Sequence, residues 1–199
     1  MRTPLLICLF AAVAAGQNQQ PAGTHVGPHM LGETFQQWLA INRLDLGEIC
    51  RPHKRSESKE MNFKAVCRTL SVIRDTGAGE FYLGDVATKQ AFRWLFTDGR
   101  LSLASTESAD VADQIKFLEQ TYGAPTTSET IPYQNSYGSK WDCLLALWRM
   151  PDGAVIRAAE SINTLPVSGV SRQLTVTFFS KERAELLTQQ EKKQNPYAR

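Results

Sequence analysis

The spacing of apolar residues changes along the chain from a helical to a strand-like period. Between residues 63 and 73, apolar side chains recur every three or four positions, as on one buried face of a helix. Between residues 92 and 96, aromatic residues alternate with others, which predicts a strand. The pair Asp98-Gly99 then signals a hairpin turn. Upstream, Thr34 is a predicted N-cap of a short helix whose apolar face includes Trp38.

A second helix and hairpin are predicted further along. Helical spacing recurs over residues 111–122 and stops at Gly123. A strand follows, in which residues 144, 146 and 148 share one side, and it turns at Asp152-Gly153. Both hairpins contain the pattern Trp-x-x-x-Asp-Gly, with Trp94 in the first and Trp148 in the second. We therefore expect both tryptophans to face the core and both Asp-Gly pairs to lie at hairpin tips.

The two similar helix-plus-hairpin halves, residues 33–105 and 106–180, are expected to form one domain. Their order of helices and strands predicts an α+β fold, a mostly antiparallel sheet with helices on one face. Residues 17–32 are rich in Gln, Gly and Pro without periodicity, which predicts a flexible leader. Residues 181–199 are polar and are predicted to form a helix or tail. A single domain should thus span residues 33–180.

The first residues have the pattern of a secretory signal peptide. Arg2 precedes an apolar run, residues 5–15, which is too short to cross a bilayer and is followed by small residues. Residues 1–16 are therefore predicted to be removed, with cleavage between Ala14 and Gln17. The mature protein is expected to be secreted or periplasmic. No later apolar run approaches membrane-spanning length, so stable membrane insertion of the mature chain is not expected.

Charge argues against one class of partner. The chain has 22 basic and 20 acidic residues, and removal of the signal takes away one of the basic residues. The mature protein is then nearly neutral, whereas nucleic-acid binding ordinarily needs a concentrated basic surface. We therefore expect no nucleic-acid partner.

Three cysteines remain after signal removal, and an oxidising compartment permits one disulfide. Three different pairings are open, and each leaves one thiol over. Cys50 ends one helical stretch, whereas Cys67 lies on the apolar stripe of the next. A bridge between them would close a loop of about 18 residues and stabilise by about 3 kcal/mol through loop-closure entropy. We favour Cys50–Cys67 and expect Cys143 to be a buried free thiol.

The sharpest catalytic motif is Asp75-Thr76-Gly77, which matches the aspartic-protease signature. In such enzymes the aspartate follows an apolar strand and is paired with a second one. Here the preceding run is helical and no second copy of the motif occurs, so only a homodimer could supply the partner carboxylate. A glycine-stopped helix end explains the motif more simply. A homodimeric aspartic protease is the alternative function, a hydrolase.

Other candidate chemistries lack a full set of groups. His25 and His29 have the spacing of helical metal ligands, but Val-Gly-Pro lies between them. Cys50, His53 and Cys67 are one ligand short of a structural zinc site. The sequence lacks the G-x-S-x-G nucleophile motif, the H-E-x-x-H metalloprotease motif and a glycine-rich phosphate loop. We therefore predict no metal, no cofactor and no catalytic residue.

An aromatic segment is the best candidate for recognition. Tyr133, Tyr137 and Trp141 surround a polar, glycine-containing loop, a composition that is frequent at binding surfaces. A hairpin with ordinary aromatic packing is the simpler alternative. We predict a non-enzymatic, extracytoplasmic binding module that contacts an unidentified protein or small ligand through its sheet or this loop.

The order of elements, with a cysteine-bearing helical segment, resembles the tandem-repeat fold of the beta-lactamase-inhibitor type. That likeness is topological and implies a fold but no inhibitory residue. Short segments are also similar to small exported bacterial proteins of unknown function: GETFQQWL (32–39), NFKAVC (62–67), YGAP (122–125) and WRMPDGA (148–154). This second resemblance would cover most of residues 32–180 and implies no activity.

Overall fold

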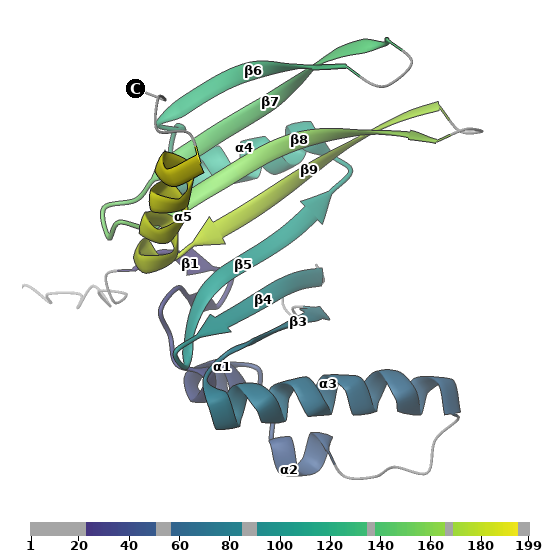
Figure 1. Ribbon diagram of the computed structural model, residues 1–199, viewed down its shortest axis with the longest axis vertical. Helices are drawn as coiled ribbons and strands as arrows, with labels where there is room; N and C mark the ends of the chain where they lie inside the picture. The colour runs from purple at the N-terminus through teal and green to yellow at the C-terminus, as the bar shows by residue number, and fades with distance from the viewer. Residues whose placement is uncertain (1–22, 51–56, 85–90, 135–137, 166–168, 195–199) are drawn as a thin grey trace, which may run out of the picture.

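The fold is that of a computed structural model, which describes residues 23–50, 57–84, 91–134, 138–165 and 169–194. A seven-stranded antiparallel sheet dominates it, with strand order β3-β4-β5-β9-β8-β7-β6 (Figure 1). A separate two-stranded hairpin, β1-β2, precedes the sheet in the chain. The predicted α+β class is therefore confirmed. The elements are β1 (His25–Val26), β2 (His29–Met30), α1 (Phe35–Ile41), α2 (Leu46–Ile49), α3 (Glu57–Thr76), β3 (Gly79–Gly84), β4 (Ala91–Thr97), β5 (Arg100–Ser108), α4 (Val111–Tyr122), β6 (Thr127–Gln134), β7 (Lys140–Arg149), β8 (Val155–Leu165), β9 (Gly169–Phe179) and α5 (Lys181–Gln194).

The chain repeats one unit, a helix followed by three strands. The first unit is α3-β3-β4-β5 and the second is α4-β6-β7-β8, and β9 joins them by pairing with both β5 and β8. Trp94 and Trp148 occupy the central strand of their units, and both are buried. Asp98-Gly99 forms the turn between β4 and β5 with positive φ at both residues, 51° and 72°. The predictions for the tryptophans and for this hairpin tip are confirmed.

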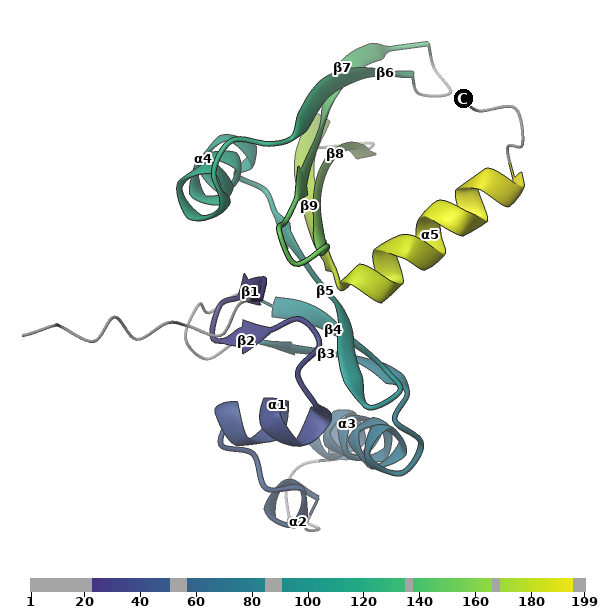
Figure 2. The same ribbon diagram turned by 90° about the vertical axis from the view of Figure 1, so that its left-hand side faces the viewer.

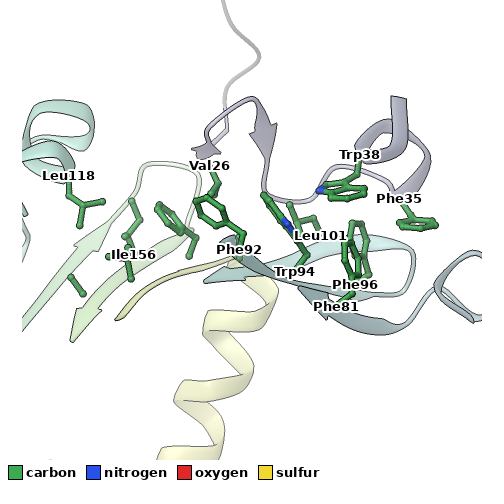
Figure 3. Packing of buried hydrophobic residues seen from close by; sticks show 14 of the residues in the cluster. Val26, Phe35, Trp38, Phe81, Phe92, Trp94, Phe96, Leu101, Leu118 and Ile156 are labelled. Atoms are coloured by element: carbon green, nitrogen blue, oxygen red, sulfur yellow. The ribbon is translucent and has the colours of Figure 1, made fainter. Parts of the chain in front are cut away.

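The core lies on one face of the sheet, under α1, α3 and α4. Thr34 caps α1 with a full capping box, because its side chain accepts from the backbone of Gln37 and the Gln37 side chain accepts in return from the backbone N–H of Thr34. The cap orients α1 so that Trp38 packs edge-on against Phe81 and Trp94, with ring centroids 5.0 and 5.7 Å away. Figure 3 shows these rings together with Leu118 of α4 and Ile156 of β8 in one cluster. Both halves therefore share one core.

The predicted flexible leader is wrong for residues 23–32, which form the β1-β2 hairpin against the core. His29 is fully buried and stacks on Trp38 with ring centroids 5.4 Å apart. Its Nε2 accepts from the amide of Asn42 at 3.1 Å, and its Nδ1 donates to Glu33 at 2.7 Å. The segment is held by polar contacts, so its sequence has no periodic apolar residues. It therefore has the composition of a flexible leader although it is folded. Residues 17–22 lie outside the described residues.

Helix α5 lies apart from the other helices. Residues 181–194 form a helix, but it lies against the face of the sheet opposite α4 (Figure 2). Its first residue, Lys181, lays its aliphatic stem over Gly153 at the tip of the β7-β8 hairpin. Helices α1, α3 and α4 of the predicted domain thus lie on one face, and α5, from the segment predicted as a polar helix or tail, lies on the other. Among the described helices, none has both the length and the apolar character needed to cross a bilayer.

Candidate binding surface

The register of the sheet sends alternate side chains to its two faces. Trp148, Ile156 and Phe178 are aligned across β7, β8 and β9 and point to the core. Their chain neighbours point the other way, to the side of α5. We call this second side the open face. Over β6 to β9 it includes Glu129, Ile131, Tyr133, Trp141, Cys143, Leu145, Leu147, Arg149, Val155, Arg157 and Phe179.

A groove of about 760 Å³ lies between the open face and α5. Its floor is mostly apolar and comes from Leu145, Leu147, Val155 and Phe179. The α5 wall includes Ala184, Glu185, Leu187, Thr188 and Gln189. This volume lies within the usual range for ligand sites, which are apolar concavities with a few oriented polar groups. The groove therefore has the size and composition of a binding site.

Three cations line this groove: Arg149 of β7, Arg157 of β8 and Lys181 of α5. None of them forms an ion pair with another residue in the described part of the chain. Arg93 lies on the same side of the sheet and behaves differently, because two of its nitrogens donate to Glu80 at 2.7 Å each. Glu185 is the acid in the groove lining. The groove therefore offers more positive charge than its own residues neutralise.

Two of the three predicted aromatic residues meet on the open face. Tyr133 and Trp141 are direct partners across β6 and β7, with ring centroids 6.1 Å apart. Tyr133 is 42% exposed, and the neighbouring Ile131 on the same face is 43% exposed. Tyr137 lies outside the described residues. The aromatic pair connects to the groove through Cys143 and Leu145 along β7, so the two features form one continuous surface.

The sequence reasoning missed the groove itself. The alternation of residues 144, 146 and 148 leaves Leu145 and Leu147 on the other side of the strand, where the structure places them, but it does not signal a groove there. The available signal was the run Cys143 to Trp148, which is apolar at every position and so places apolar groups on both faces of β7. The sequence contained no comparable indication that Arg157 lines a groove, because a lone arginine in a strand is usually solvated.

The thiols differ in their surroundings. Cys143 is buried on the open face, and this burial raises its pKa, so the thiol stays protonated at neutral pH. Cys67 is hydrogen-bonded to Cys50, and burial together with this contact raises its pKa to about 12. The Cys50–Cys67 bridge stays a prediction. The hydrogen bond between the two side chains shows that they lie close enough together to be considered as partners.

Asp75 is not placed as an aspartic protease requires. It lies in the last turn of α3 rather than at a strand end, and Arg74 donates to both of its oxygens, at 2.8 and 3.3 Å. These bonds hold the pKa of Asp75 below its usual value. Gly77 has φ of 73°, and a Cβ there would come within 2.7 Å of the backbone nitrogen of Gly99. The motif is thus explained by the end of α3 packing on the β4-β5 turn.

The histidines have structural surroundings as well. His29 is held by Glu33 and Asn42, so both of its ring nitrogens have partners. The backbone carbonyl of His25 accepts from the hydroxyl of Tyr122 at 2.6 Å, and burial raises the pKa of that tyrosine to about 12. His53 lies outside the described residues. Across the described ranges, no three His, Cys, Asp or Glu side chains come together as a metal site would require.

Comparisons of the chain with protein-family models, with curated proteins and with solved structures found no match.

Proposed function

We propose that this protein is a binding module whose open face receives its partner. The observation that carries the proposal is the asymmetry of the sheet. One face is filled by a shared aromatic core, whereas the other holds the groove under α5 and an exposed aromatic pair, Tyr133 and Trp141. Apolar groups in a concavity, next to aromatic side chains and to arginines that have no ion-pair partner among the described residues, have the composition of recognition surfaces.

The groups on this surface favour binding over catalysis. Cys143 lies beside the groove on β7, but burial raises its pKa and so disfavours the thiolate that would attack a substrate. The cations Arg149 and Arg157 suit the recognition of an anion, because a guanidinium donates hydrogen bonds and keeps its charge. We also propose that binding takes place outside the cytoplasm, for which the signal-peptide pattern of residues 1–16 is the support.

Site-specific photocrosslinking in the cells that make the protein tests this proposal. A benzophenone-bearing phenylalanine analogue at Tyr133 preserves the aromatic shape and places the reactive group on the open face. The same analogue at Phe117 is the control, because this side chain of α4 is 55% exposed on the other side of the sheet. We expect one defined adduct from position 133 and none from position 117. Adducts of equal yield from both positions, or from neither, would contradict the proposal.

A further inference from the structure

The charge and the length of the open face identify the chemistry of its partner. We infer that the partner is an acidic, partly apolar segment of polypeptide, bound in extended form along β7. Its acidic residues lie at the α5 end of the groove, and its apolar residues lie on Tyr133 and Trp141. This inference rests on the proposed function and specifies the occupant of the same surface.

Charge complementarity sets the sign of the partner. Arg149 and Arg157 come from adjacent strands, and Lys181 begins the helix that forms the opposite wall. The described residues give none of the three an ion-pair partner, although the same side of the sheet pairs Arg93 tightly with Glu80. Three positive groups around an apolar floor outnumber Glu185 in the lining and Glu129, which lies beside Leu145 on the same face of β6. This balance favours carboxylates and disfavours a basic segment.

Length favours a chain segment over a small anionic amphiphile. The surface runs along β7 from Trp141 to Arg149, a distance of roughly 26 Å at about 3.3 Å per residue. An extended peptide of about eight residues covers that distance. A ligand confined to the groove would contact Leu147 and Phe179 but would leave Ile131 and Tyr133 exposed at the other end. Only a longer ligand can therefore contact the groove and the aromatic pair at the same time.

The sheet edge argues for recognition through side chains. Strand β6 is the edge next to this surface, and Pro132 lies in its middle, paired with Asp142 of β7. Proline has no N–H to give to an added strand, and natural edge strands use it to prevent such pairing. A peptide added to this edge would lack that hydrogen bond, whereas one lying across the open face meets side chains at every second position.

Binding of three matched peptides to the mature protein tests the inference. Each is fluorescein-labelled, about eight residues long, with leucine and tyrosine in its first half. The second half carries four glutamates in one, four glutamines in the next and four lysines in the third. Measured by anisotropy at low salt, the glutamate peptide should bind about tenfold tighter than the glutamine peptide, and the lysine peptide should bind weakest.

Charge reversal locates the effect. Arg157→Glu should weaken the glutamate peptide about tenfold and leave the glutamine peptide nearly unchanged. Lys116→Glu is the matched control, since it makes the same charge change at an exposed position of α4, on the far side of the sheet. It should leave all three affinities unchanged. Arg149→Glu is a second groove variant, and circular dichroism checks that each variant is folded.

Several outcomes would overturn the inference. These are equal affinities for the three peptides, no binding of any peptide, or equal effects of Arg157→Glu and Lys116→Glu. Displacement of the glutamate peptide by decanoate at equal concentration would show that a small amphiphile is the better occupant and would also overturn it. If position 133 still crosslinks in cells under these outcomes, the binding surface stands and only its acidic partner is refuted. Loss of the crosslink as well refutes the proposed function.

Discussion

Replacing Trp148 by phenylalanine should destabilise the protein more than the same change at Trp94 or Trp38. All three indoles are buried, so each substitution loses a similar amount of buried ring. Their N–H groups differ. Nε1 of Trp148 donates to the carbonyl of Gly123 at 2.8 Å, and that of Trp94 reaches the carbonyl of Leu83 only at 3.4 Å. Nε1 of Trp38 has no hydrogen-bond partner among the described residues.

The expected magnitudes follow from these contacts. A hydrogen bond contributes about 1 kcal/mol net, whereas a buried N–H without a partner costs about 1–3 kcal/mol. Trp148→Phe loses a good bond, and Trp38→Phe removes an unpaired donor, so the two should differ by at least about 2 kcal/mol. For a domain of this size that difference is about 6 °C in Tm. Full truncation by Trp148→Ala or Trp94→Ala should cost about 3–5 kcal/mol.

Urea unfolding followed by far-ultraviolet circular dichroism measures these values without relying on the fluorescence of the replaced residues. The phenylalanine variants should rank Trp148, Trp94, Trp38 from most to least destabilised. Equal losses at the three sites would refute the argument from the N–H groups. If Trp94→Ala and Trp148→Ala melted like the wild type, the assignment of both residues to the core would be refuted instead.

Three further predictions address other parts of the chain. Glu33→Ala should destabilise by about 1–3 kcal/mol in urea titrations, because it leaves the buried Nδ1 of His29 without an acceptor; a change below experimental error would contradict the network. Non-reducing peptide mapping of exported protein should find Cys50 linked to Cys67, and replacing both by serine should cost about 3 kcal/mol; a bridge to any other cysteine would refute the pairing. Intact-mass analysis of exported material should show that residues 1–16 or a close variant of that segment are absent, and retention of Met1 would contradict the signal peptide.

Much of the local structure could be read from the sequence because local physics decides it. The helical stripe of α3, the alternation in β4 and the capping box of α1 each depend on residues a few positions apart. The two Trp-x-x-x-Asp-Gly patterns likewise combine a strand period with turn residues that accept positive φ. Burial of both tryptophans followed from these patterns, since they share a face with apolar neighbours on the same strand.

The binding surface was decided by contacts between distant segments. Both faces of β7 are apolar, and the groove exists because α5 lies over the face away from Trp148. The β1-β2 segment is held by the bond from the Thr24 hydroxyl to Asp152 at 3.0 Å, across 128 residues, and no local period signals it. Strand register and the placement of α5 bring Arg149, Arg157 and Lys181 together around the groove. Both depend on long-range pairing rather than on the sequence around each residue.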